Sequence, residues 1–225
     1  MIKIEINYAI PMGLKCPVAY WLKDNGLRKC SYPFDWTRLI TLDPVIESLN
    51  DDFSKLLDKS YYTDTKTPRR FKYTCGHSSL TNGHDLFWHR DMRLTDHYAG
   101  LCRSVERFRG VLKKSSPKLF MIGTYFRENL DISEHIKNVK RLNNELSKLT
   151  SNFYIFSLVH FKSKYFPSDS KTKVETDGNI KFAELYTAGD LGLKKTGKRL
   201  RSNSDWAIER ELIHSLYEFS IFNDI

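Results

Sequence analysis

The sequence has few cysteines and no metal-binding arrangement of them. Its 225 residues include four, Cys16, Cys30, Cys75 and Cys102, and no two of these form a C-x-x-C pair. This spacing excludes a zinc ribbon and a thioredoxin motif. A chain of this length buries a full core without disulfides. We therefore expect reduced thiols and a soluble, intracellular (cytoplasmic) protein.

Two further absences narrow the class of protein. No apolar run is long enough to span a membrane, and the first residues lack the long apolar region and cleavage site of a signal peptide. The sequence Asp-x-Asp does not occur, which argues against a metal-dependent sugar-nucleotide transferase that uses this motif. A metal-independent transferase passes the same test.

The charge balance is basic. The formal net charge is +9, which favours an anionic partner such as nucleic acid, a nucleotide-activated substrate, an acidic glycan or a membrane surface. The cations are scattered except at Arg69-Arg70 with Lys72 and at Lys194 to Arg201. We expect an anionic or glycan small-molecule substrate and no stable nucleic-acid partner.

The stretch from Tyr8 to Trp36 organises the chain. An apolar strand, Ile2 to Ile10, leads through a Pro-Met-Gly turn to Cys16 and Pro17. Proline is favoured at the first helical position, so Cys16 is the predicted cap of a helix Pro17–Asn25 that Gly26 ends. A thiol at a helix N-terminus has a lowered pKa and reacts as a nucleophile. The alternative is a small buried residue under the helix.

The remaining pattern alternates helices and strands. We predict helices over Asp43 to Lys59, Asp96 to Lys114 and Asp205–Phe222. A further helix opens with a capping box at Asp131, carries one apolar stripe from Ile132 to Leu149 and is broken by Asn152. Apolar strands are predicted at Lys118–Phe126, Phe153–Phe161 and Ile180–Thr187, with a polar loop, Lys162–Gly178, before the last. The expected fold is a Rossmann-like, layered α/β domain with a largely parallel sheet.

The chain is expected to be one domain, residues 1–225, with two long surface segments. Residues 61–83 lack periodicity and read as a long loop or lid. Residues 189–204 form a basic loop, in which the run from Gly192 to Lys198 has the outline of a phosphate-binding loop. Arg199 replaces the Ser or Thr that would bind magnesium, so the modest interpretation is a basic loop in which Lys198, Arg199 and Arg201 touch an anionic substrate.

Several uncommon sequence motifs resemble those of one domain family. Gly13-Leu14-Lys15-Cys16, Tyr32-Pro33-Phe34-Asp35-Trp36 and Phe87-Trp88-His89-Arg90-Asp91 occur in its order. The family is a domain of unproven function labelled "putative papain-like cysteine peptidase". It usually has Ser-Leu-Gly where this chain has Pro11-Met12-Gly13. The opening is also, more loosely, similar to capsule-polysaccharide acyltransferases with a Gly-Asn-Cys turn. Papain-like proteins pack the nucleophile's helix against an antiparallel barrel, whereas the pattern here favours parallel strands.

Cysteine catalysis requires a base and a group that orients it. His89 is the leading candidate base, and Asp91 would face the same side of an extended segment. Asp35 needs a partner between its aromatic neighbours, and it either orients a histidine or pairs with Arg28 or Arg107. His160, at the end of a strand, is the alternative base or a substrate contact.

Other interpretations of these residues stay open. Gly13 and Trp36 complete the expected substrate site. His89 and Asp91 with a distant histidine also match the spacing of a metal triad, but we expect no metal and no required cofactor.

We therefore hypothesise a cysteine-dependent hydrolase or acyltransferase in surface-glycan or glycoconjugate metabolism, with an acyl donor as substrate. The first alternative is a metal-independent glycosyltransferase that uses a nucleotide sugar. The second is a non-catalytic carbohydrate or nucleic-acid binding module.

Overall fold

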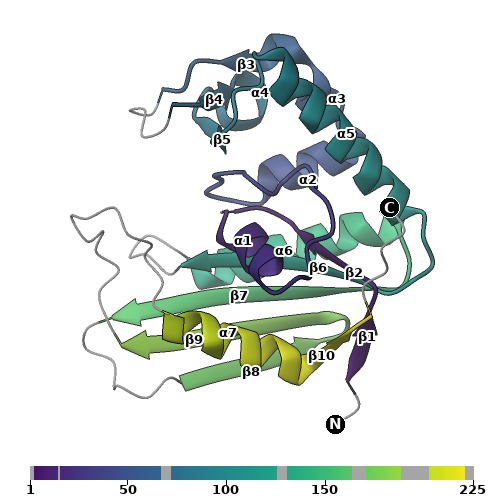
Figure 1. The fold of residues 1–225 in the computed structure, drawn as a ribbon, viewed down its shortest axis with the longest axis vertical. Coiled ribbons are helices and arrows are strands. Elements are labelled where there is room, and N and C mark those ends of the chain that lie inside the picture. The colour runs from purple at the N-terminus through teal and green to yellow at the C-terminus, as the bar shows by residue number, and fades with distance from the viewer. Residues whose placement is uncertain are drawn as a thin grey trace.

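A five-stranded mixed sheet forms the centre of the molecule (Figure 1). The computed structural model describes residues 3–14, 16–66, 72–125, 131–163, 171–188 and 203–220. The sheet order is β2-β6-β7-β9-β8, and all neighbours are parallel except β8 and β9. The strands are β2 (Tyr8–Pro11), β6 (Lys118–Tyr125), β7 (Phe153–Ser163), β8 (Lys171–Asp177) and β9 (Ile180–Ala188). The predicted α/β class with a mostly parallel sheet is confirmed at this level, whereas β8 occupies part of the predicted polar loop.

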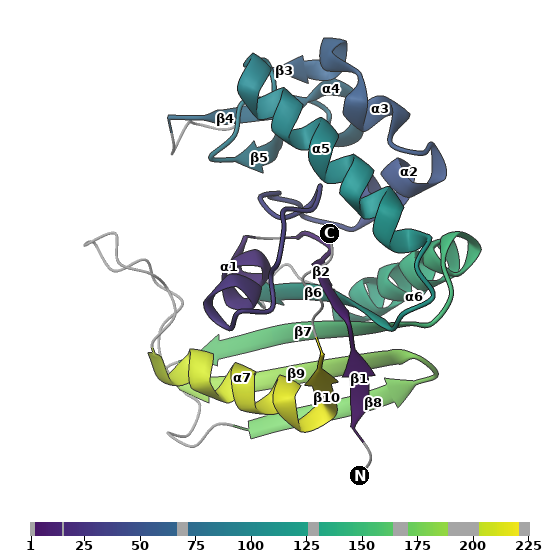
Figure 2. The same cartoon turned by 45° about the vertical axis from the view of Figure 1, so that its right-hand side comes forward.

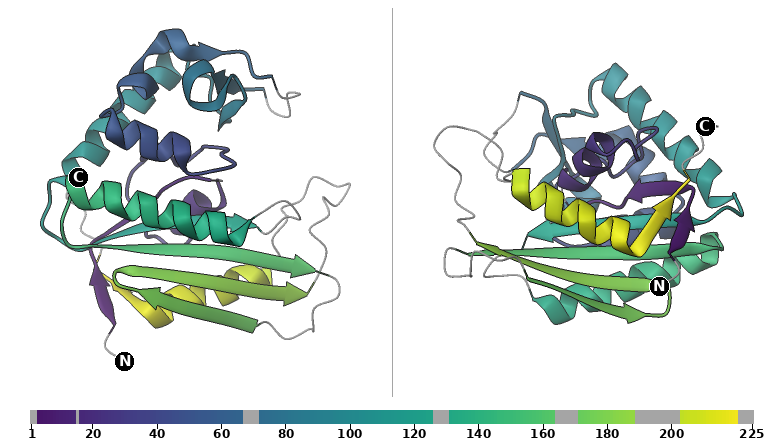
Figure 3. Two further views of the ribbon diagram at one scale, coloured as in Figure 1. Left: turned by 180° about the vertical axis from the view of Figure 1, so that it is seen from behind. Right: turned by 60° about the horizontal axis from the view of Figure 1, so that its bottom comes forward.

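Helices cover both faces of this sheet (Figures 1 and 3). One face carries α1 (Pro17–Asp24) and α7 (Asn203–Leu216). The apolar cluster on the other face includes α2 (Asp43–Asn50), α5 (Thr95–Leu112) and α6 (Ile132–Leu149). Among the described residues, no helix combines the length and the apolar character needed to cross a bilayer.

The long helices begin where their sequences predict. Asp131 caps α6, because its carboxylate accepts hydrogen bonds from the backbone N–H groups of Ser133 and Glu134. Three residues of the predicted apolar stripe, Val139, Leu142 and Leu146, are fully buried. The N-cap at Asp131 and the centre of the apolar stripe are therefore confirmed, whereas the Glu134 carboxylate accepts from Lys137 and Asn138 and Leu149 is exposed.

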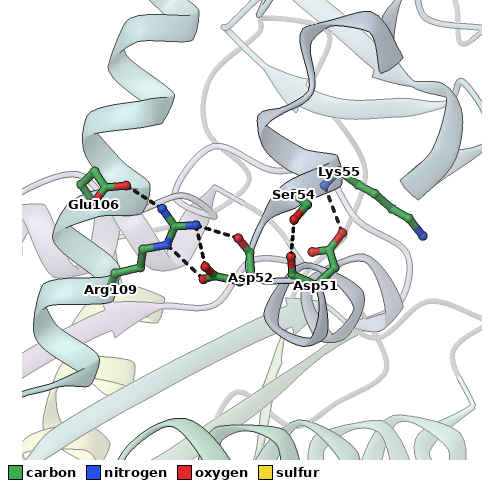
Figure 4. Close-up of polar contacts among 6 residues, drawn as sticks. All are labelled: Asp51, Asp52, Ser54, Lys55, Glu106 and Arg109. Carbon is green, nitrogen blue, oxygen red and sulfur yellow. Dashed lines mark hydrogen bonds and ion pairs between the residues drawn. The ribbon is translucent and has the colours of Figure 1, made fainter.

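The predicted helix over residues 43–59 is interrupted. It divides into α2 and α3 (Ser54–Leu57), because Asp52 and Phe53 take left-handed backbone conformations with φ of 48° and 62°. Arg109 of α5 holds this junction, as Figure 4 shows. Its guanidinium donates to both carboxylate oxygens of Asp52, at 3.0 and 2.9 Å, and to the Asp52 carbonyl at 2.7 Å. These bonds stabilise a conformation that L-residues rarely adopt.

A second, three-stranded sheet lies in the segment predicted to be a long loop. Its order is β3-β4-β5, and all pairs are antiparallel. The elements of this region are η1 (Lys59–Tyr61), β3 (Tyr62–Thr63), β4 (Thr74–His77), α4 (Ser78–Thr81) and β5 (Asp85–Trp88). The prediction of a structureless loop over 61–83 was wrong for the described part, while residues 67–71 lie outside it.

The two ends of the described chain pair with each other. The predicted first strand divides into β1 (Ile4–Ile6) and β2, and the predicted closing helix ends at Leu216. It is followed by β10 (Tyr217–Phe219), which pairs in parallel with β1. The Asn7 side chain donates a 3.0 Å hydrogen bond to the Ser220 carbonyl, which fastens the closing segment to the start of the sheet.

Candidate functional site

A glycine turn places Cys16 at the start of α1. Gly13 has φ of +81°, a conformation that glycine adopts without strain. A Cβ at Gly13 would lie 2.9 Å from the Thr37 hydroxyl oxygen, so the loop also needs glycine for its close approach. Pro17 begins the helix, and Cys16 is its N-cap residue, as predicted. Gly13 thus acts through the shape of the loop.

The Cys16 thiol is not activated by this position. Its side chain makes no capping bond to the helix, and it donates a 3.9 Å contact to the Thr37 carbonyl. The residue is 8% exposed. Burial, with a smaller contribution from the nearby charge of Asp35, raises the pKa of the thiol to about 11. This direction is opposite to the lowered pKa expected for a thiol at a helix N-terminus, and its largest cause is desolvation by burial.

Asp35 is a buried carboxylate held by Arg28, which is one of the two partners predicted for it. The Arg28 Nε donates to Asp35 Oδ2 at 2.9 Å, and a second guanidinium nitrogen contacts the same oxygen. Arg107 instead donates to the Ser31 carbonyl at 3.1 Å. Burial raises the pKa of Asp35 to about 6 despite the arginine. Asp35 therefore forms an ion pair with Arg28 beside Cys16, and none of the described histidines is hydrogen-bonded to it.

The segment after Asp35 connects Cys16 to the region of His89. Thr37 forms an antiparallel bridge with Phe87 of β5, and Trp88 N–H donates to the Trp36 carbonyl at 3.0 Å. On the other side, Leu39 N–H donates to the Leu14 carbonyl at 2.9 Å. Three backbone segments therefore lie side by side, and those that carry Cys16 and His89 are separated by one. Two strand spacings correspond to about 10 Å between backbones.

His89 directly follows β5 and is exposed. Its φ of 64° lies in the left-handed region, which histidine enters more readily than most residues and which often marks functional sites. Partial burial and the charge of Arg90 lower the pKa of its imidazole, so the ring is neutral at pH 7 and can accept a proton. Among the described residues the Cys16 thiol forms no hydrogen bond with His89 or any other histidine.

Asp91 is held by an arginine. Arg93 donates to its two carboxylate oxygens at 2.9 and 2.7 Å. The pairing of His89 with Asp91 was predicted for an extended segment, but β5 ends at Trp88 and the backbone turns at His89. Arg93 thus holds the carboxylate, and the pairing of Asp91 with His89 stays a prediction.

Partly exposed aromatic rings flank the site. Trp36 packs edge-to-face against Tyr20 of α1, with ring centroids 5.0 Å apart. The Arg28 guanidinium lies 5.4 Å from the centroid of the same indole, and Arg38 lies 4.5 Å from that of Trp88. Trp36 thus lies at the surface close to Cys16, where it was predicted to contact substrate.

His160 lies apart from these residues, under α7. It is 1% exposed, and its Nε2 is 2.7 Å from the Thr187 hydroxyl. Its Nδ1 lies 3.2 Å from a carboxylate oxygen of Glu209. The side chain is near the carboxyl end of β7, as predicted, but it faces protein groups. The basic residues Lys198, Arg199 and Arg201 lie outside the described residues.

The sequence interpretation missed two contributors, Thr37 and Glu209. No local pattern indicates that the Thr37 carbonyl faces Cys16, because the contact comes from tertiary packing. For Glu209 a signal existed, since it precedes the apolar Ile213 by four residues and so shares its helix face. In the described part of the chain, no group of three or more His, Cys, Asp or Glu side chains is arranged to hold a metal ion.

Comparison with known proteins places the chain in a family. The model of the family described as "Putative papain-like cysteine peptidase" matches residues 7–163. This range includes Cys16, Asp35, His89 and Asp91, and it ends before β8, β9 and α7. No curated protein and no solved structure matches the chain.

Proposed function

Because the chain belongs to the family described as "Putative papain-like cysteine peptidase", we propose that it is a cysteine-dependent hydrolase in which Cys16 is the nucleophile and His89 the base. The observation that carries the proposal is the alignment of three segments, which brings the start of α1 and the end of β5 to either side of Thr37. A cysteine-dependent hydrolase needs a thiol and a nearby base that can accept its proton.

The Cys16 thiol must lose its proton before it can react as a nucleophile. A thiol with a pKa of about 11 is ionised to roughly one part in ten thousand at pH 7. The proposal is that substrate binding over Trp36 draws His89 toward Cys16. Backbone geometry supports this, because His89 lies just beyond the last residue of β5 and is exposed. Catalytic hydrogen bonds are often formed only in the substrate complex.

The proposed reaction is acyl transfer through a thioester. Proton transfer from Cys16 Sγ to His89 accompanies attack of sulfur on the substrate carbonyl, whose oxygen becomes an oxyanion. The N–H groups of Val18 and Ala19 are the available donors for it, because Pro17 has none and the first helical bond is donated by Tyr20. The protonated His89 then gives its proton to the leaving group, and the carbon–heteroatom bond breaks.

The second half of the reaction decides between hydrolysis and transfer. Water attacks the thioester in hydrolysis, whereas a hydroxyl group of a glycan would attack it in acyl transfer. His89 takes the proton of the attacking group, and Cys16 leaves as a thiol. This chemistry requires no metal and no organic cofactor.

The test is loss of turnover in Cys16→Ser. Candidate substrates are a peptide library and a set of acylated glycans, with products identified by mass spectrometry. We expect a loss of at least about a thousandfold, because serine lacks the nucleophilicity of a thiol. Cys102→Ser, at a half-buried cysteine of α5, is the matched control and should retain activity. Full activity in Cys16→Ser would exclude the proposed nucleophile.

A further inference from the structure

A buried polar cluster connects α7 to the main sheet. His160 of β7 contacts Thr187 of β9 at 2.7 Å and Glu209 of α7 at 3.2 Å. His160 and Glu209 are each 1% exposed, and Thr187 is 4% exposed. Glu209 lies outside the range that the family model matches. The proposed hydrolysis uses none of these three residues.

The buried carboxyl group of Glu209 needs a polar partner, and this requirement favours one position of α7 on the sheet. A carboxylate removed from water is costly unless a charged or hydrogen-bonding partner faces it. The oxygen atoms of a carboxyl group accept hydrogen bonds, so the Glu209 side chain suits the tautomer of His160 that carries its N–H at Nδ1. The approach of His160 Nδ1 to the Glu209 carboxylate at 3.2 Å is a close polar contact rather than an aligned hydrogen bond. Rotation or translation of α7 would leave the carboxylate buried without this partner.

The same face of the sheet carries α1. One apolar cluster contains residues of both helices, namely Val18, Trp21 and Leu22 of α1 and Ile213 of α7. Phe156 of β7 and Tyr217 after α7 belong to the same cluster, with ring centroids 6.1 Å apart. Figure 2 shows α1 and α7 on the same side of the strands. The position of α7 is thus linked by packing to the helix that begins at Cys16.

We propose that the contact between His160 and Glu209 is a latch that holds α7 on the sheet, and that it positions α1 and keeps the Cys16 thiol covered. His160 and Glu209 are positioning residues in this account, since neither touches Cys16. The consequence for catalysis rests on the proposed function. The latch itself is tested by the alkylation rate of the Cys16 thiol, which requires no turnover.

The experiment measures alkylation of individual cysteines by iodoacetamide at pH 8, followed by mass spectrometry. Glu209→Gln keeps the shape of the side chain and removes its charge. Cys75 is the internal reference, because it is 0% exposed and lies in the cluster on the other face. We expect Cys16 to react about 5- to 30-fold faster in the variant, the range that a moderate local destabilisation produces. Cys75 should change much less.

A matched control lies on the opposite side of the same strand. His135 of α6 is buried, and its Nε2 is 2.9 Å from the Ser157 hydroxyl of β7. His135→Gln perturbs a buried histidine that docks a different helix. It should leave the ratio of Cys16 to Cys75 alkylation unchanged. A similar rise of this ratio in both variants would show that β7 is generally loosened. It would contradict a specific role for the contact between His160 and Glu209.

Two further variants complete the test. In the double variant His160→Gln/Glu209→Gln, the effect on the alkylation ratio should be less than the product of the two single effects, because both remove one interaction. If Glu209→Gln does not fold, Ile213→Val loosens α7 by a single methyl group and should raise the ratio severalfold. An unchanged ratio in a folded Glu209→Gln or Ile213→Val variant would refute the proposal. Loss of turnover in Cys16→Ser would remain informative in either case.

Discussion

The two faces of the main sheet are covered in different ways. The face toward α5 and α6 carries a continuous aromatic cluster, in which Phe108 lies within 6.4 Å, between ring centroids, of Tyr32, Phe34, Phe53 and Phe120. The face toward α1 and α7 has a smaller apolar cluster. It adds a very close helix–strand approach at Gly123 and the buried contact of His160 with Glu209.

This difference indicates that one face mainly contributes to global stability and the other mainly positions α1. Apolar area and aromatic packing stabilise without fixing one exact arrangement, and they tolerate substitutions that conserve volume. Close backbone approach and buried charge have steep geometric requirements. The second kind of contact lies on the face that carries the helix of Cys16. We therefore expect substitutions on the first face to change global stability and those on the second to change the position of α1.

The largest expected effect is on the aromatic face. Phe108→Ala removes a ring that is 0% exposed, and the free energy of unfolding should fall by about 3–5 kcal/mol. Urea denaturation measures this change. Tyr73→Ala, at a residue that is 37% exposed, is the control and should change it by less than about 0.5 kcal/mol. In Phe108→Ala the alkylation of Cys16 and Cys75 should rise together, and a selective rise at Cys16 would break the distinction between the faces.

A smaller loss is expected where α1 approaches β6. A Cβ on Gly123 would lie 2.6 Å from Val18 Cγ2, so Gly123→Ala forces α1 away from the strand at a cost of about 1–3 kcal/mol. Thermal denaturation and selective alkylation of Cys16 both report this. Val18→Ala removes the clashing methyl group, and the double variant should recover most of the loss.

The matched control for this substitution is Gly110→Ala in α5. A Cβ at Gly110 would meet nothing within 4 Å, so alanine should stabilise the helix by about 0.5–1 kcal/mol. If both glycine variants lowered the stability equally, the close approach of Val18 to Gly123 would not be the cause.

Local patterns explain which parts of the fold the sequence predicts. The helix α6 follows from a cap and a stripe that lie within its own residues, and the parallel strands follow from apolar runs. The small sheet was missed because β3 and β4 have two and four residues and pair across sequence distance. The strand β10 was missed because its partner β1 is at the other end of the chain.

The same reasoning separates the site residues. A partner for Asp35 was predictable, because a carboxylate between aromatic residues needs one, but the sequence left Arg28, Arg107 and a histidine open, and tertiary packing selects Arg28. The pKa of Cys16 was not, because the local signal of a helix N-terminus lowers it and burial, which is a property of the whole fold, raises it to about 11. The left-handed turn at His89 ends the extended segment that was expected to carry His89 and Asp91, and it has no clear sequence mark.

The smallest expected effect isolates the charge of Asp35. Asp35→Asn should lower the pKa of Cys16 from about 11, but it should stay above the ordinary 9.0 because burial is the larger cause. The pH dependence of Cys16 alkylation measures this, and Asp91→Asn, at a carboxylate held by Arg93, should leave the profile unchanged.

The stability of the parent protein provides a second readout. The pKa of Asp35 is raised from 3.8 to about 6, so between these values the native state binds more protons and stability falls as pH rises. Asparagine should remove this fall, whereas a Cys16 profile identical to that of the parent would show that the carboxylate does not act on the thiol.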